Sequence, residues 1–467
     1  MKKYIAMLLA LAMLFALAAC GGSGSTPDTS TADKPADTAD KPADTAADKP
    51  ADKPDAEPIG DAVTEITLWT YPIGNWGNEE VVGELVAGFE AETGIKVTVE
   101  YLDYTNGDDK TNTAITTGET PDIIMEGPER LVANYGVNGH MVDLSDMLDD
   151  TDRSELSDAA LTPCIASDGA MYEYPLVMTA HCLAINVNAF EEAGALEYVD
   201  LDSHTWTTEQ FFKAVQALYD HYGDTVAAVY CGGQGGDQGT RAIVNSLYGG
   251  SFTNDEHTLY TWDDPLNIKA LEALYAQDGI AFDASIAGGD EIALFYQGVL
   301  KIGFCWNAAQ QLNPNQAGTG AGLTMTGDEI AFMAFPTESG TPVLEGGVWG
   351  FGIFNNNNEL RIEAAKQFIK YMCDSEHTAD AVRAANYFPA RSAAEGTDLS
   401  AIWADNDIMN EYTKTMLPYM GPYHQVTTGW AEARTAWWNM LQDVGEGADI
   451  AAAVAEWAGE ANGAAVS

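Results

Sequence analysis

The spacing of apolar residues from residue 66 onward predicts strands and helices in alternation. Residues 66–69, 95–99 and 121–125 have the short apolar or alternating pattern of strands. Between the first two, residues 78–92 place apolar side chains three and four positions apart, as one face of a helix requires. Strands that alternate with helices favour a mainly parallel sheet covered by helices, so we expect an α/β fold.

The pattern returns to strands late in the chain. Thr207 begins a capping box, which predicts the start of a helix. Residues 300–306 and 348–353 predict strands, and residues 360–373 and 430–457 predict helices. Because strands return after a long, mainly helical middle, we expect a second domain inserted into the first.

Composition excludes several classes of partner. The 467 residues include 71 Asp and Glu against 21 Lys and Arg, a formal net charge of −50. This surplus argues against nucleic acid and anionic lipid headgroups as partners, since both attract Lys and Arg. A single apolar run, at the N-terminus, approaches the length of a membrane span, which excludes a bundle of transmembrane helices.

That run has the features of a secretory signal. Lys2 and Lys3 precede an apolar segment over residues 5–17, and small residues then lead to Cys20. The sequence Leu-Ala-Ala-Cys resembles the processing box of bacterial lipoproteins, in which the cysteine is lipidated and becomes the mature N-terminus. We expect a signal peptide over residues 1–20 and a lipid anchor on Cys20 at the extracellular face of the cell membrane. The alternative is an ordinary signal peptide with an incidental cysteine.

Residues 21–60 repeat Ala-Asp-Lys-Pro and have little apolar surface to bury, so we expect a disordered tether. An extended chain of this length reaches ~120 Å at ~3.1 Å per residue. Residues 1–20 carry a charge of +2 and residues 21–60 a charge of −5, which leaves −47 for residues 61–467. The acidity therefore belongs to the folded part of the chain.

The other five cysteines are too widely spaced for a Cys-x-x-Cys metal or redox motif. Five is an odd number, so at least one thiol stays free, and we expect buried free thiols. We expect neither a metal nor a cofactor. The five residues are Cys164, Cys182, Cys231, Cys305 and Cys373.

Seven short segments follow one another in the order and spacing of a known family. They are Phe89-Glu90-x-x-x-Gly94-Ile95-Lys96-Val97, residues 118–124, 169–175 and 183–190, Trp206-Thr207, Phe335-Pro336, and residues 346–350. Each segment is weak alone, but together they resemble the sugar-binding, maltodextrin-binding-like family of bacterial extracellular solute-binding proteins.

The resemblance implies a two-lobed α/β fold of the periplasmic-binding-protein type. Such lobes are joined by about three hinge crossings, and the ligand binds in the cleft between them. The implied crossings lie near residues 174–180, 335–340 and 388–392, with an N-terminal lobe over 61–176 and 338–388 and a C-terminal lobe over 180–335 and 392–460.

Members of the family bind solutes without converting them and deliver them to the permease subunits of ABC importers. The resemblance therefore implies a monomeric, lipid-anchored protein that binds a carbohydrate. Two alternatives stay open. One is a binding protein for a peptide, polyamine or other cationic solute, which the acidic body would attract. The other is a secreted glycoside hydrolase, whose paired carboxylates cannot be recognised among 71 acidic residues.

Aromatic residues at the lobe edges are candidates for ligand binding, because an aromatic plane can cover the apolar face of a sugar ring. Tyr71 and Trp76 follow the first predicted strand, and Trp306 ends a later one. Trp349 lies within a strand, and Trp430 resembles a cleft tryptophan before the family's C-terminal helices. Core packing is the alternative for each. The candidates are Tyr71, Trp76, Trp306, Trp349 and Trp430.

Polar candidates follow the predicted strand over residues 121–125. Glu126 is placed to accept hydrogen bonds from hydroxyl groups, and Glu129 with Arg130 match an acid–arginine pair of the family. The alternative is a surface ion pair at the start of a helix. An aromatic residue expected beside this turn is missing, and Thr179 stands where a carboxylate is expected, so the pattern departs from that of maltodextrin binders.

Two further polar segments are predicted to be structural. The glycine-rich loop over residues 232–237 lacks the Lys-Ser/Thr of a phosphate loop, so we expect a flexible loop or part of the cleft rim. An acidic segment lacks the glycine bend of a calcium loop, so we expect a solvated helix face. Its residues are Asp143, Asp146, Asp149, Asp150 and Asp152.

A Cys20→Ser variant is expected to lose the lipid anchor, because the cysteine thiol is the group that lipoprotein processing acylates. Cell fractionation followed by mass measurement should find unlipidated protein in the medium. If the serine variant stays bound to the membrane, the lipoprotein interpretation is wrong.

Overall fold

The computed structural model describes residues 63–104, 106–233, 236–312, 320–421, 423 and 426–466. Our predictions for the signal peptide, for Cys20 and for the tether over residues 21–60 concern residues outside this part of the chain, so they stay predictions. The described residues form two α/β lobes, the first built around one sheet and the second around two. Among them, none of the helices has the length and apolar character needed to cross a membrane.

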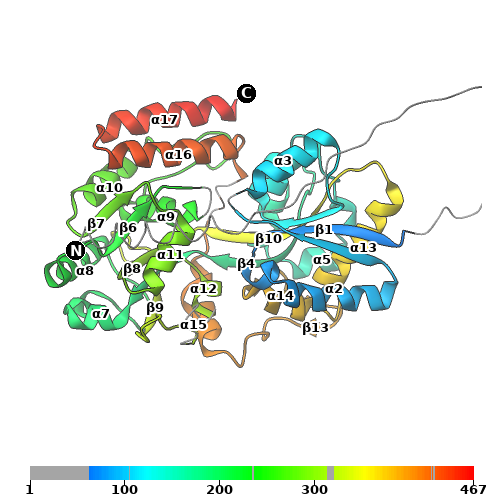
Figure 1. Cartoon of the computed structure of the whole chain (residues 1–467), viewed down its shortest axis with the longest axis horizontal. Helices are drawn as coiled ribbons and strands as arrows, with labels where there is room; N and C mark the ends of the chain where they lie inside the picture. Colours follow the sequence, from blue (N-terminus) through cyan, green and yellow to red (C-terminus); the bar gives the residue numbers. More distant parts are fainter. Residues whose placement is uncertain are drawn as a thin grey trace, which may run out of the picture. The chain divides into compact units, whose positions relative to one another are not determined.

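The first lobe contains a six-stranded sheet. In spatial order its strands are β11 (Phe388–Pro389), β4 (Tyr174–Ala180), β10 (Gly346–Ile353), β3 (Ile123–Glu126), β1 (Glu65–Thr70) and β2 (Lys96–Tyr101), as Figure 1 shows in part. β1 is parallel to β2 and β3, but β10 is antiparallel to both β3 and β4. The prediction of a mainly parallel sheet is therefore wrong. The reason is that β10 comes back from the second lobe, so it runs in the direction opposite to β3 and β4.

Local signals explain where the first-lobe helices begin and end. Asn78 caps α2 (Glu79–Thr93) with its side-chain oxygen, which accepts a hydrogen bond of 2.9 Å from the backbone N–H of Glu80. Gly94 ends the helix in a left-handed conformation with φ +73°, which glycine adopts without strain. The other helices of this lobe are α3 (Gly107–Thr117), α4 (Pro128–Arg130), α5 (Asp150–Glu155), α6 (Asp158–Leu161), α13 (Glu359–Cys373) and α14 (Thr378–Ala385).

The second lobe contains two smaller sheets. Three antiparallel strands lie in the order β8 (Ile302–Trp306), β5 (Cys182–Asn186) and β9 (Ile330–Met333), and a parallel pair is formed by β6 (Ala227–Tyr230) and β7 (Ile280–Asp283). The capping box predicted at Thr207 is confirmed. Its helix is α8 (Thr208–Tyr222), and the others are α7 (Val187–Glu192), α9 (Asp237–Tyr248), α10 (Pro265–Ala276), α11 (Gly288–Tyr296), α12 (Ala308–Leu312), α15 (Asp407–Thr415), α16 (Trp430–Gly445) and α17 (Ile450–Ala465).

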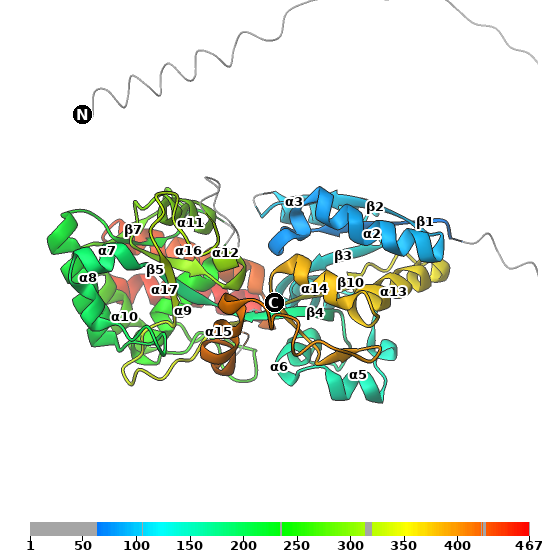
Figure 2. The same ribbon diagram turned by 90° about the horizontal axis from the view of Figure 1, so that it is seen from below.

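The lobes are connected where β4 and β10 meet the second lobe (Figures 1 and 2). β4 continues through His181 into β5, and residues 334–345 lead back from β9 to β10. The two connections are tied together, because the backbone N–H of His181 donates to the carbonyl of Glu345 at 2.8 Å. This hydrogen bond places both connections at the base of one hinge.

The third connection, predicted near residues 388–392, stays a prediction. Arg391 is still part of the first lobe, where its guanidinium pairs with Asp374 at 2.8 Å and with Asp152 at 3.2 Å. β12 (Ala393–Ala394) and β13 (Thr397–Asp398) follow before α15 begins. Asp152 is buried by these contacts, so its predicted place on a solvated helix face is wrong.

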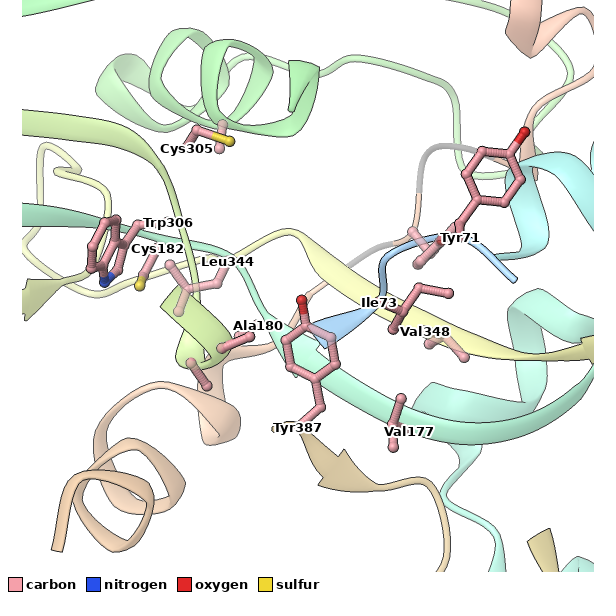
Figure 3. Packing of buried hydrophobic residues seen from close by; sticks show 14 of the residues in the cluster. Tyr71, Ile73, Val177, Ala180, Cys182, Cys305, Trp306, Leu344, Val348 and Tyr387 are labelled. Carbon is pink, nitrogen blue, oxygen red and sulfur yellow. The ribbon is translucent and has the colours of Figure 1, made fainter. Parts of the chain in front are cut away.

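Two tryptophans that we expected beside the ligand lie in the core. Trp76 is fully buried, and its Nε1 donates to the carbonyl of Ala381 at 3.1 Å. Trp306 is 1% exposed, and its Nε1 donates to Gln311 at 2.9 Å. Trp306 pairs with Cys182 across β8 and β5, and Figure 3 shows the two side by side. Neither indole offers a face to a ligand, because the end of β8 turns Trp306 inward and the turn after β1 packs Trp76 under α14.

The cysteine prediction is confirmed for the described residues. All five thiols beyond Cys20 are free and buried. Burial raises the pKa of Cys182 and of Cys231 to about 12 in each case, so both stay protonated at neutral pH.

A Trp306→Ala variant is expected to lose ~3–5 kcal/mol of unfolding free energy, because it removes a fully packed indole and leaves a cavity. Urea unfolding checks this value, with Trp306→Phe as a milder control that keeps an aromatic ring. A loss below ~1 kcal/mol would contradict the core assignment.

Candidate functional site

A cavity of about 700 Å³ lies between the two lobes and is lined by both of them. Its volume falls in the range of small-molecule binding sites. We call this cavity the cleft. Its charged and aromatic lining residues are Tyr104, Glu126, Glu129, Arg130, His181, Asp237, Asp290, Trp349, Tyr387, Tyr423, Trp430 and Arg434.

The cleft contains a stacked pair of aromatic rings from the first lobe. Trp349 and Tyr387 lie with their ring centroids 4.7 Å apart and their planes within 9° of each other. The β4–β10 pairing shifts register between Trp349 and Gly350, and such irregularities re-aim a side chain out of the regular alternation. A Cβ atom on Gly347 would lie 2.5 Å from the Trp349 ring and 2.9 Å from His181, so glycine is required here.

Arg130 is the centre of charge on the first-lobe wall. Its guanidinium donates to both carboxylate oxygens of Asp108, at 2.6 and 2.9 Å, and to Glu126 at 2.8 Å. Glu129 lies 3.3 Å away, and its other oxygen accepts a hydrogen bond of 2.7 Å from the hydroxyl of Tyr423. Three carboxylates therefore surround one guanidinium, which leaves this wall with more negative than positive groups.

Burial reduces this excess of negative charge by keeping a proton on one carboxyl group. It raises the pKa of Glu126 to about 8, although the charge of Arg130 acts in the opposite direction. Burial would also raise the pKa of Asp108, but the Arg130 guanidinium brings that pKa below its ordinary value. Asp108 is thus an ionic partner of Arg130, with Glu129 as a second at 3.3 Å, and Glu126 carries a proton at neutral pH.

On the second-lobe wall, a carboxylate is held between two guanidinium groups. Asp237, at the start of α9, accepts a hydrogen bond of 3.0 Å from Nε of Arg434 and a second one from Arg241. The guanidinium carbon of Arg241 lies 4.7 Å from the ring centroid of Trp430, a cation–π distance. Burial, with a contribution from Arg130, lowers the pKa of Arg434 to about 10, so Arg434 stays charged at neutral pH.

His181 lies at the base of the cleft, on the first connection between the lobes. It is 3% exposed and meets the Trp349 ring edge-on, with centroids 6.0 Å apart. Burial lowers its pKa to about 3, with the charge of Arg241 acting in the same direction, so the imidazole is neutral at physiological pH. Nδ1 has no hydrogen-bond partner among the described residues, which leaves it free to exchange a hydrogen bond with a ligand hydroxyl.

The structure brings five of the eight predicted site residues to the cleft. Tyr71 lies one layer behind it, stacked on Tyr104 at 5.1 Å, with its hydroxyl donating to Asp108 at 2.9 Å. Trp76 and Trp306 are core residues, as described above. The five that line the cleft, whose role in binding stays a prediction, are Glu126, Glu129, Arg130, Trp349 and Trp430.

Several lining residues were missed by the sequence reasoning. Tyr423 and Arg434 flank Trp430 in the chain, so the segment that singled out Trp430 could have indicated them. The loop over residues 232–237 contributes Gly232, Gly233, Gly236 and Asp237, which agrees with its possible place on the rim. Tyr104, His181 and Tyr387 had no signal, because a single tyrosine or histidine next to a strand is common in any α/β protein.

No group of three or more His, Cys, Asp or Glu side chains in the described part of the chain is placed to hold a metal ion. Each cleft carboxylate with an assigned partner instead faces a guanidinium, a hydroxyl or a backbone N–H. The described lining therefore presents hydrogen-bonding groups to the cleft.

Comparison with known proteins agrees with this architecture. The family model described as "Bacterial extracellular solute-binding protein" matches residues 84–410, which is more than half of the chain. A maltooligosaccharide ABC transporter solute-binding lipoprotein of Streptococcus pneumoniae serotype 4 is 30% identical over 151 residues, or 32% of this chain. That match spans 31% of the length of the relative.

Solved structures share the fold at low sequence identity. An ABC transporter solute-binding protein from Thermotoga lettingae bound with α-D-tagatose has a TM-score of 0.70 and 16% identity, over 86% of this chain and 100% of the other. One from Agrobacterium radiobacter in complex with ribitol has a TM-score of 0.65 and 20% identity, over 86% of this chain and 98% of the other. With the family match over residues 84–410 and a ligand-sized cleft between two lobes, the chain belongs to the bacterial extracellular solute-binding protein family.

Proposed function

We propose that this protein captures a carbohydrate outside the cell and delivers it unchanged to the permease subunits of an ABC importer. The observation that carries the proposal is the stacked pair of Trp349 and Tyr387 in a cleft with hydrogen-bonding groups on both walls. The proposal includes a lipid anchor on Cys20 and a monomeric protein.

The chemistry of a sugar suits such a cleft. A sugar ring has an apolar face of C–H groups, which the Trp349 ring can cover, and a rim of hydroxyl groups. Arg130 and Arg434 can donate to ring and hydroxyl oxygens, and Glu129 can accept from hydroxyl groups. Because the groups come from both lobes, a ligand held by them would favour the closed arrangement of the lobes.

The ligands in the names of the similar proteins support this choice. The pneumococcal relative is named for maltooligosaccharides, and the two structures hold tagatose and ribitol. All are uncharged and rich in hydroxyl groups. The relative is also named as an ABC transporter lipoprotein, which supports the importer and the anchor on Cys20.

A cationic solute is the second candidate, and one observation favours it. Four acidic side chains line the cleft against two arginines. The proton on Glu126 reduces this excess at neutral pH, so the sugar proposal is preferred. The four acids are Glu126, Glu129, Asp237 and Asp290.

A Trp349→Ala variant is expected to bind its sugar about 5–150-fold more weakly, because losing a stacked ring costs ~1–3 kcal/mol. Its melting temperature should change little, since the indole is half-buried at the cleft wall. Calorimetry with the best saccharide from a thermal-shift screen measures the affinity. Trp306→Ala is the matched control, with the opposite result of lower stability and similar affinity.

Unchanged affinity in Trp349→Ala would contradict the proposed sugar site. The same samples also test whether the protein acts as a glycoside hydrolase. Release of reducing ends from the bound saccharide would show catalysis and overturn the binding-protein proposal.

The affinity for an uncharged sugar is expected to fall above about pH 8, because Glu126 then loses the proton that it donates and becomes a buried charge. Linkage limits the change to about tenfold per pH unit. A Glu126→Gln variant should remove this pH dependence, since the amide cannot ionise.

The sign of the pH effect distinguishes the two candidates. A cationic ligand should bind more tightly above about pH 8, because ionised Glu126 attracts it. Calorimetry at several pH values measures the sign. Glu272→Gln, an exposed change on α10, is the control for general charge effects.

A further inference from the structure

A second cavity of about 600 Å³ lies beside the connection that leads from β9 to β10. Among the described residues, it shares no lining residue with the cleft. One side is formed by the end of α9 and the loop after it, including Asn245 and Asp255, and the other side by residues 337–345 of the connection. We call it the hinge-side cavity.

The described lining of the hinge-side cavity carries negative charge alone. Three carboxylates line it, from Asp255, Glu338 and Glu345, and no lysine or arginine does. Glu338 is exposed and lies 3.4 Å from Lys269, which is outside the lining. Asp255 is exposed, whereas the side chain of Glu345 is only 4% exposed.

Two buried acceptor atoms of the lining lack hydrogen-bond partners among the described residues. Oε1 of Glu345 accepts from Arg241 at 2.5 Å, but Oε2 has no partner. Oδ1 of Asn245 has none either. A buried acceptor without a donor is costly, so both atoms favour an occupant that supplies N–H or O–H groups.

The geometry points to a second binding site in this cavity, and we propose that it takes a small aliphatic ammonium ion, such as a diamine. An ammonium group has three N–H donors and no acceptor, which matches two unpartnered acceptors. Arg241 and Lys269 pair with Glu345 and Glu338 from outside the lining, so the ammonium charge would add to theirs and be attracted by Asp255 as the third carboxylate. The short apolar stem of a diamine can pack on Val343, which also lines the cavity, beside Tyr248, whose ring has the Lys269 ammonium group 3.5 Å from its centroid.

An occupant of this site would contact the hinge. Glu345 lies in the connection between the lobes, and its backbone carbonyl accepts from His181 at the base of the cleft. Its carboxylate also holds Arg241, whose guanidinium faces Trp430. The ammonium ion would therefore share the Glu345 carboxylate with Arg241, which contacts Trp430 in the cleft wall.

Calorimetry of the mature chain with putrescine tests the proposal. One saturable site is expected, and 1,4-butanediol, which has the same length without charge, should bind at least about tenfold more weakly. Glu345→Gln should weaken putrescine binding about tenfold or more, because one charge-assisted hydrogen bond is lost. Glu272→Gln, which removes the same charge outside the cavity, should leave it unchanged.

A second variant keeps the test decisive if Glu345→Gln fails to fold, because that change also removes a partner of buried Arg241. Asn245→Ala alters no charge and removes the other unpartnered acceptor, so putrescine binding should weaken several-fold while the melting temperature is kept. Unchanged binding in Asn245→Ala would overturn the proposal.

Three other results would also overturn it. The first is no saturable binding of putrescine, which would mean that water satisfies the two acceptors. The second is an equal response to magnesium chloride, or an equal loss in Glu272→Gln, which would indicate general attraction to an acidic protein. The third is loss of putrescine binding in Trp349→Ala or Glu126→Gln, which would place the amine in the cleft. Failure of saccharide binding with putrescine binding intact would overturn the sugar proposal alone.

Discussion

The antiparallel pairing of β4 with β10 is the constraint on which the rest of the structure depends. β4 leads from the first lobe into the second, and β10 leads back, so the hydrogen bonds between them join the two chain connections into one hinge. The same pairing places Trp349 in the cleft, through the register shift before Gly350. The hinge and part of the cleft wall are thus formed by one strand pair. A change in the angle between the lobes must therefore act on residues that line the cleft.

The charged groups of the cleft lie on the two walls beside the β4–β10 strand pair. Arg130 on one wall and Asp237 on the other each hold two or more groups of opposite charge, so few charged groups in the described lining face an unmatched neighbour. Such preorganised pairs hold donors and acceptors in fixed positions, which lowers the entropy cost of ordering them around a ligand. The described lining of the hinge-side cavity differs, since Glu345 and Glu338 pair with cations that lie outside it, Arg241 and Lys269.

The two-lobed fold could be predicted because its signals are local. The capping box at Thr207 and the helical spacing over residues 78–92 follow from adjacent residues, and the family motifs extended them to the architecture. The strand directions could not be predicted, because the direction of β10 depends on a connection through the other lobe. The site was only partly predictable for a similar reason. Trp349 and Trp306 both lie in strand patterns. The register of its strand turns Trp349 into the cleft and Trp306 into the core, and the sequence alone does not give that register.

The central claim is that a sugar binds between the lobes against the β4–β10 base. Hydrogen–deuterium exchange of the mature chain with and without a bound saccharide tests it most directly. We expect slower exchange in residues 126–130, 346–350 and 385–389 of the first lobe and in residues 236–238 of the second, with little change at residues 245–255. Slower exchange in one lobe alone, or none in residues 346–350 while calorimetry shows saturable binding, would contradict the account.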